Sequence, residues 1–394
     1  MNARLVLGEE DVGPNPKIRT LSKGYREAKG DVVWMLDSNI WVAPGVMRRS
    51  VNRLCGIDET GNQTKKPFKF VHHLPVGVAC IEEPLAGIDI EARHITPQPS
   101  STSLVALFRK FIGSFGGRLE ETFLSTSHAK FYTAINTVGI APCVLGKSNM
   151  FRKSHLAAVT PAEAPGILDF AHNICEDHML AERIWLVPLP EERNGTEKWG
   201  KHALGEDLVF QPMANMKVQD YWDRRTRWLR VRKYAIIAAT LAEPETESFL
   251  CSFVGGYGFI TLLERYKLTE ILISPENWSK WIAIFYFWLL SVTVWSICDY
   301  VNFKVLHGFE HISIDKNTPR FVRDVREKWV KRVWEGSLRG WLFQWIGREA
   351  LALPVFLWAM LPGDVRWRGG RYRVGWDMKV RQVGEVNGVG KRRA

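Results

Sequence analysis

The sequence predicts an α/β domain followed by a membrane region. Short apolar runs that end in a polar residue, typical of buried strands, lie in the first half of the chain. The second half contains long apolar runs, so the mean hydropathy of −0.13 averages two unlike parts. We expect three regions, at residues 1–233, 234–365 and 366–394.

Composition and charge limit the classes of function. Of the 394 residues, 46% are hydrophobic, which excludes global disorder. The formal net charge of +11 suits anionic lipid headgroups or phosphate-bearing substrates. Nucleic acid is not an expected partner, because the sequence holds no helix-turn-helix, zinc-finger or RNA-binding signature. The six cysteines are scattered, which predicts reduced thiols and no zinc site.

In the first half, residues 32–36 form an apolar, β-rich run that ends in Asp37. Ligands of open α/β sheets gather at such strand ends, so Asp37 is a candidate site residue. Residues 70–72 and 142–144 are weaker strand candidates. Residues 104–124 have the pattern of an amphipathic helix, and residues 188–205 that of a loop.

The second half contains three apolar runs. Residues 281–297 carry no charge and are just long enough to span a bilayer. Residues 248–263 are weakened by three glycines, and residues 341–361 contain Arg348 and Glu349. Charges within a span are costly, so we expect this pair to face protein or a polar cavity. The alternative is that these runs are buried helices of a large soluble domain.

Asp37, Ser38 and Asn39 form the first candidate site. An aspartate at a strand end, with another oxygen ligand two residues later, suits Mg²⁺ or Mn²⁺. The same residues also start turns or cap helices.

Glu176 and Asp177 precede a predicted helix and form the second. The positive end of the helix dipole stabilises an ionised carboxylate, which can serve as a general base. The alternative is an acidic cap in the first turn.

A cluster of basic residues with one tryptophan forms the third candidate site. Several guanidinium groups on one segment suit a diphosphate, or equally the anionic headgroups of a membrane. The cluster consists of Arg224, Arg225, Arg227, Trp228, Arg230, Arg232 and Lys233.

Taken in order, these segments and four others resemble the ceramide glucosyltransferase family, and fungal members in particular. The motifs are Asn15-Pro-Lys-Ile, Asp37-Ser-Asn, His72-His-Leu-Pro, Thr126-Ser-His-Ala-Lys-Phe-Tyr, Glu176-Asp177, Arg224-x-x-Arg-Trp228 and Trp367-Arg-Gly-Gly-Arg-Tyr-Arg373. The resemblance implies a Rossmann-like glycosyltransferase A (GT-A) fold, followed by transmembrane or interfacial helices. It also implies UDP-glucose as donor, ceramide as acceptor, a lipid bilayer as partner, and a Golgi or ER membrane with the catalytic domain facing the cytosol.

The resemblance further implies a role for each matching residue. Asp177 is the expected base in an inverting transfer, and Asp37 the ligand of a Mg²⁺ or Mn²⁺ ion. The implied donor-binding residues are Asn15, Lys17, Asp37, Asn39, Arg224, Arg227 and Trp228. The implied acceptor or pocket residues are His128, Cys143 and Glu176.

Two departures from the family keep alternatives open. The family begins with a membrane helix and a strand that carries a first aspartate, whereas this sequence opens downstream of both. We therefore expect a truncated N-terminus. In addition, Asn39 stands where a strict Asp-x-Asp motif has a second acid. The alternatives are a processive polysaccharide synthase of the same superfamily and an inactive truncated membrane paralogue.

The basic tail predicts a topology. The positive-inside rule places the arginines after residue 361 on the cytosolic side, so one apolar run must be interfacial or re-entrant. Residues 248–263 are the candidate. This arrangement puts residues 367–373 beside the active site, and it leaves the sequon at Asn194 on the cytosolic side, unmodified.

Overall fold

The computed structural model describes residues 4–63, 66–80, 104–196, 198–241, 243, 247–267, 280–308, 312–323, 338–367 and 370–383. Its centre is a five-stranded mixed sheet in the order β1-β4-β3-β5-β2. β3 and β5 are parallel, and the other neighbours are antiparallel. The strands are β1 (Val32–Leu36), β2 (Trp41–Val42), β3 (Phe70–Cys80), β4 (Ser148–Arg152) and β5 (Ala203–Ala214).

Side-chain alternation along the strands builds a core on each face of the sheet. Phe70 and Phe151 point to one face, where they pack under four helices. Val71 and Met150 point to the other face, where Leu54 of α2 (Val46–Cys55) covers them. The helices on the first face are α1 (Pro16–Glu27), α5 (Lys153–Val159), the 3₁₀ helix η1 (Gly166–Phe170) and α6 (Glu176–Leu186). The result is a three-layer α/β domain.

β3 and β5 are long enough to reach a second group of helices. These are α3 (Leu104–Ser125), α4 (Ser127–Val138) and α8 (Val218–Ala235). α3 crosses the start of α8 closely, because a Cβ on Gly116 would lie 1.9 Å from the carbonyl oxygen of Lys217. Glycine is therefore required at this crossing.

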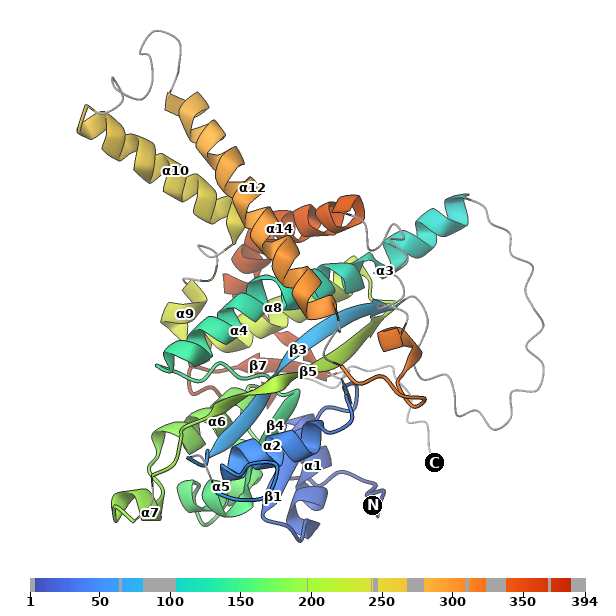
Figure 1. The fold of residues 1–394 in the computed structure, drawn as a ribbon, viewed down its shortest axis with the longest axis vertical. Helices are drawn as coiled ribbons and strands as arrows, with labels where there is room; N and C mark the ends of the chain where they lie inside the picture. Colours follow the sequence, from blue (N-terminus) through green and yellow to red (C-terminus); the bar gives the residue numbers. More distant parts are fainter. Residues whose placement is uncertain are drawn as a thin grey trace, which may run out of the picture.

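Two helices, α10 (Ser248–Arg265) and α12 (Lys280–His307), project together from this body (Figure 1). They expose many large apolar side chains, including Phe259 and Leu290. Within the part of the chain that the structure describes, α12 is the one helix long and apolar enough to cross a membrane. α14 (Leu338–Met360) lies across their base, and the short α9 (Ile237–Leu241) follows α8.

The expected strand at residues 32–36 and the expected helix from residue 104 are confirmed as β1 and α3. The strand expected at residues 70–72 is confirmed as the start of β3. The strand expected at residues 142–144 is wrong, because this segment is irregular. The side-chain amide of Asn136 donates to the carbonyl oxygen of Cys143 at 2.7 Å and accepts from its backbone N–H at 3.1 Å. These two backbone groups are therefore not available to a neighbouring strand.

The segment expected to be a loop, residues 188–205, is largely irregular but not entirely so. It contains the one-turn helix α7 (Pro190–Arg193) and the first residues of β5. The sequence after residue 365 also folds in part, into a three-stranded antiparallel sheet of β6 (Val365–Trp367), β7 (Gly370–Val374) and β8 (Val380–Gln382). The rest of the expected basic tail, residues 384–394, lies outside the described residues.

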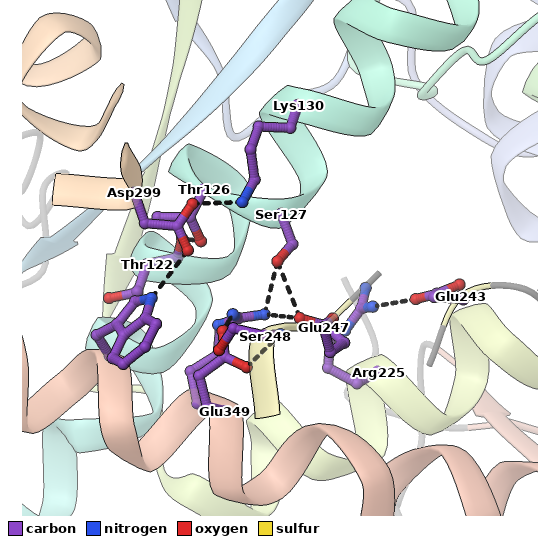
Figure 2. A network of polar contacts seen from close by, with 12 residues as sticks. Thr122, Thr126, Ser127, Lys130, Arg225, Glu243, Glu247, Ser248, Asp299 and Glu349 are labelled. Carbon is purple, nitrogen blue, oxygen red and sulfur yellow. Dashed lines mark hydrogen bonds and ion pairs between the residues drawn. The ribbon is translucent and has the colours of Figure 1, made fainter. Parts of the chain in front are cut away.

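A buried ionic network joins the projecting helices to the α/β body, and Figure 2 shows it. Arg348 of α14 is 1% exposed and forms ion pairs with Glu247 and Glu349. It also donates to Oγ of Ser127 at 2.8 Å, and Glu349 accepts from the backbone amide of Ser248 at 3.0 Å. The expectation that Arg348 and Glu349 face protein is confirmed.

A second part of the network ties α12 to α4. Asp299 of α12 is fully buried and forms an ion pair with Lys130 of α4. Its other oxygen accepts from Nε1 of Trp345 at 2.9 Å. Three helices thus share one buried carboxylate, which keeps their relative positions specific.

We predict that Arg348→Ala destabilises the protein by about 3–5 kcal/mol, because it leaves Glu247 and Glu349 buried without their cation. Arg339→Ala, on the exposed surface of the same helix, serves as the control, with an expected change within about 0.5 kcal/mol. The free energy of unfolding in detergent is the measurement. Equal stability of the two variants would contradict the role assigned to Arg348.

Candidate active site

A cavity of ≈ 310 Å³ lies where α1, β1, α4, α6 and α8 meet. Charged and apolar side chains both line it, with the ion-paired Arg225, Arg232 and Glu243 among them, and we call the two groups described next the charged end and the apolar end. The charged end is lined by Lys17, Asp37, Lys147, Glu176, Asp177, Arg224 and Arg227. The apolar end is lined by Phe131, Ile135, Ala141, Pro142, Ile236 and Ala239, among others.

Lys17 lies at the centre of the charged end. Its Nζ is 3.2 Å from Oδ1 of Asp37 and 3.0 Å from Oε1 of Glu176, and it donates to the carbonyl oxygen of Gly146 at 2.8 Å. Burial alone would lower the pKa of Lys17, but Glu176, Asp37 and Asp177 together raise it. Lys17 is therefore a permanent cation.

Asn15 fixes the position of Lys17 by capping the helix on which Lys17 lies. It caps α1, with Oδ1 accepting from the backbone amides of Lys17 and Ile18 at 2.8 and 3.2 Å. Its Nδ2 donates to Glu176 at 3.1 Å. Asn15 is fully buried and does not line the cavity. Its role is therefore to hold Lys17 and Glu176 in position, and not to contact a ligand.

Asp37 follows the last residue of β1 and faces two lysines. Its Oδ2 is 2.6 Å from Nζ of Lys147, and its Oδ1 is engaged by Lys17. Burial would raise the pKa of Asp37, but the two lysines lower it below its ordinary value. Asn39, two residues further, is exposed and does not line the cavity.

The carboxylate of Asp37 only partly compensates the positive charge of the buried Lys147. Burial, aided by the nearby Arg224, lowers its pKa to about 8 even though Asp37 opposes the shift. A buried lysine with a depressed pKa gains from an added anion. The charged end is thus suited to binding a phosphate group.

Asp177 begins α6 with Glu176, as the sequence suggested. Burial raises the pKa of each carboxyl above its ordinary value, although Lys17 pulls both the other way. A Cβ on Gly146 would lie 2.5 Å from Nζ of Lys17 and 3.2 Å from Oδ2 of Asp177, so a larger residue here would displace Lys17. The acidic pair is therefore both the first turn of a helix and part of the cavity wall.

The arginines of α8 separate into two groups. Arg224 pairs with Glu120 at 2.7 Å, and Arg225 and Arg232 pair with Glu243 at 3.0 and 2.7 Å. Arg227 has no carboxylate within ion-pair distance among the residues described. Burial and the neighbouring Arg224 lower its pKa to about 10, still well above neutral pH.

Trp228 lies below the guanidinium of Arg224, 4.7 Å from ring centre to carbon, and so orients it toward the cavity. The structure thus brings Arg224, Arg227 and Trp228 to one site, which leaves Arg227 as the guanidinium with most to gain from an anionic ligand.

His128 and Cys143 lie between the two ends of the cavity. Burial, reinforced by Arg225, lowers the pKa of His128 to about 3, so its ring is neutral. In the described part of the chain its Nδ1 has no hydrogen-bond partner. Burial raises the pKa of the Cys143 thiol to about 11. Both residues therefore present neutral polar groups to a ligand.

Reasoning from sequence missed Lys147 and Glu243, and it placed Trp367 near the site without a role. The only sequence signal for Lys147 is its place just before β4. Trp367 lines the cavity, whereas Arg371 and Arg373, which we expected beside the diphosphate, pair with Asp364 instead, at 2.8 and 3.0 Å.

The expected cation site is not preformed. In the residues described, no group of three or more histidine, cysteine or acidic side chains is placed to hold a metal ion. Both oxygens of Asp37 are already paired with lysines. In this arrangement lysine and arginine supply the positive charge near Asp37, and a Mg²⁺ or Mn²⁺ ion at Asp37 stays a prediction.

Comparison with known proteins assigns the class. The model of glycosyl transferase family 21 matches residues 1–79 and 102–380. This match covers the sheet, the residues that line the cavity and the helices α10, α12 and α14, and it defines the chain as a glycosyltransferase. The chain belongs to glycosyl transferase family 21.

Several relatives carry the name ceramide glucosyltransferase. The protein of Gibberella zeae is 39% identical, over 97% of this chain and 74% of its own length. The protein of Pyricularia oryzae is also 39% identical, over 96% of this chain and 72% of its own length. That of Candida albicans is 30% identical, over 97% of this chain and 75% of its own length. No solved structure matches the chain.

We predict that the affinity for UDP decreases as the pH rises through about 8. The protonated form of Lys147 attracts the diphosphate, and this form is lost above its pKa of about 8. Isothermal titration at pH 7 to 9 measures the effect, with Lys29→Gln, an exposed lysine of the same domain, as control. Lys147→Gln should bind UDP weakly at all these pH values. An unchanged pH dependence in Lys147→Gln would show that another group is responsible.

Proposed function

We propose that this protein transfers glucose from UDP-glucose to the primary hydroxyl of ceramide, with inversion at the anomeric carbon. The observation that carries the proposal is the single cavity that joins a cationic, carboxylate-bearing end to an apolar end. Such a cavity suits a nucleotide sugar and a lipid that meet at one point. The names of the relatives support the same reaction.

The donor is proposed to bind at the charged end, in a GT-A arrangement of the sheet. Lys147, Arg224 and Arg227 would hold the diphosphate, since all three line the charged end and burial there favours an anion beside Lys147 and Arg227. The ring of Trp228 packs against the guanidinium group of Arg224. Lys17 would stay paired with the carboxylates and fix their positions.

The acceptor is proposed to bind at the apolar end. Its hydrocarbon would lie against Phe131 and Ile135 of α4, and its polar head near His128 and Cys143. His128 lines the cavity with a neutral ring, which suits contact with the polar head of the lipid. A growing polysaccharide would need a polar lining, so the apolar end favours a lipid acceptor over a polymer.

Asp177 is the proposed general base. It takes the proton of the primary hydroxyl while the oxygen attacks the anomeric carbon from the face opposite the leaving group. The bond from that carbon to the phosphate oxygen breaks, and UDP leaves with its charge stabilised by Lys147, Arg224 and Arg227. A raised pKa makes Asp177 a stronger base than an ordinary carboxylate.

A divalent cation stays a prediction rather than part of these steps. Mg²⁺ or Mn²⁺ usually keeps several waters and binds through one or two carboxylates together with substrate phosphates. Asp37 is the one carboxylate we assign to such an ion, which would arrive with the donor.

We also propose that the enzyme resides in a Golgi or ER membrane with its catalytic domain in the cytosol. The exposed apolar surfaces of α10 and α12 support membrane residence. β6, β7 and β8 pack on α8 and on the segment before Asp177, which supports a position of these strands on the same side of the membrane as the catalytic domain.

We predict that Asp177→Asn abolishes formation of glucosylceramide while it leaves UDP binding nearly unchanged. Loss of a general base typically lowers the rate by about 10²–10⁴. In the unchanged protein, kcat/KM should fall on acidification at a pH above the ordinary carboxyl range, because protonation of Asp177 removes the base and its pKa is raised.

Product analysis by mass spectrometry, with UDP-glucose and ceramide, is the measurement, and Asp169→Asn, outside the cavity, is the control. Wild-type turnover by Asp177→Asn would refute the role of Asp177. No glucosylceramide from the unchanged protein would refute the proposed function.

We predict that Asn194 carries no glycan, although it is exposed and lies in an Asn-Gly-Thr sequon. A cytosolic catalytic domain never meets the lumenal glycosylation machinery. Glycosidase treatment followed by intact-mass measurement tests this on protein from a eukaryotic host. A glycan on Asn194 would reverse the proposed orientation.

A further inference from the structure

Four exposed apolar residues surround the outer end of the cavity. Val138 and Ile140 lie at and just after the end of α4, and they are 67% and 80% exposed. Ile237 and Leu241 lie on α9 and are 52% and 58% exposed. We call these four residues the rim.

The rim borders the apolar end of the cavity on two sides. Ile135 and Ala141, on either side of Val138 and Ile140 in the chain, line the cavity. Ile236 and Ala239, beside Ile237 on the other segment, line it as well. Each segment therefore turns one apolar side inward and another outward, and α9 and the far end of α4 lie on the same side of the molecule (Figure 1).

The outward-facing side of these two segments lies near exposed apolar residues of α14. Lys233, near the end of α8, donates to the carbonyl oxygens of Ala359 and Met360, at 3.2 Å each, so the start of α9 lies close to the end of α14. This end of α14 exposes Leu357, 57%, and Trp358, 51%. Large exposed apolar surface next to a cavity marks a place where the protein meets a membrane or a partner.

From the position of these exposed apolar residues beside the cavity and near one another, we infer that the rim dips into the bilayer surface and forms the lateral entry through which the hydrocarbon chains of the acceptor reach the cavity. The inference rests on the proposed function, since it needs a lipid acceptor. A ceramide leaving the bilayer must keep its chains away from water. An apolar rim in the membrane gives the chains a continuous path, while the charged end stays on the aqueous side.

The test compares a bilayer-embedded acceptor with a water-soluble one. In Ile140→Glu and Ile237→Glu, we expect the KM for long-chain ceramide in phosphatidylcholine vesicles to rise roughly tenfold, the factor that burial of one aliphatic side chain supports. The KM for a water-soluble short-chain ceramide and the affinity for UDP should not change. Met47→Glu, at a 47% exposed position on α2, is the matched control.

A second measurement uses the unchanged protein. A diazirine-bearing long-chain ceramide in vesicles should crosslink, on illumination, to peptides that contain Ile140 and Ile237. Crosslinks confined to α10 and α12 would overturn the inference. So would rim variants whose KM values change equally for both acceptors or for neither, or a dimer of this chain that the rim variants abolish.

The two proposals fail in different ways. If the unchanged protein transfers no glucose even to the short-chain ceramide, the proposed function is wrong, and the crosslinking map still shows whether the rim contacts lipid. If it transfers glucose but the rim variants use embedded ceramide normally, only the entry path is wrong.

Discussion

The ammonium group of Lys17 is the interaction on which the charged end of the cavity depends. It holds Asp37 from β1 and Glu176 from α6, and it bonds the carbonyl oxygen of Gly146 between them. Three segments far apart in the chain are thus drawn to one point. Without this cation, buried carboxylates would repel one another and take up protons. Asp177 could not then remain available as a base.

The apolar end of the cavity depends on the packing of α4 against α12 and α14. α4 carries His128 and Ile135 on the cavity side and Lys130 on the side that faces α12. Arg348 connects α14 to Ser127 at the start of the same helix. The proposed acceptor end is therefore built on a helix whose position is set by buried polar contacts with α12 and α14. The proposed donor and acceptor sites are held by different interactions.

Much of the architecture was predictable from sequence, because apolar periodicity and long charge-free runs report directly on burial. β1 and α3 were found in this way, and Arg348 and Glu349 were correctly expected to face protein. The strand β4 was missed, since its residues include Ser148, Asn149 and Arg152 and form no apolar run. Its place in the sheet depends on pairing with β1 and β3, which no local pattern reveals.

The site residues show the same division. Motif resemblance pointed to Asp37 at a strand end, to Asp177 in the first turn of a helix and to Arg227 in the middle of α8. It did not find Lys147, whose importance arises only when folding places it 2.6 Å from Asp37. Nor did the spacing of residues in the sequence show that neither Asn15, which is buried, nor Asn39, which is exposed, lines the cavity. Such distinctions depend on side-chain direction in three dimensions.

The buried pair of Lys130 and Asp299 has a mechanical consequence. Asp299 sits near the end of α12 that adjoins the catalytic body, and sliding this helix along its axis would break a buried ion pair. α12 therefore acts as a fixed strut, and under the proposed function it would set how deep the catalytic domain sits against the lipid. Ceramides with acyl chains of different length would then meet the cavity at the same headgroup level. Discrimination between them would come from the space available for the chain, and not from the height at which the head is presented.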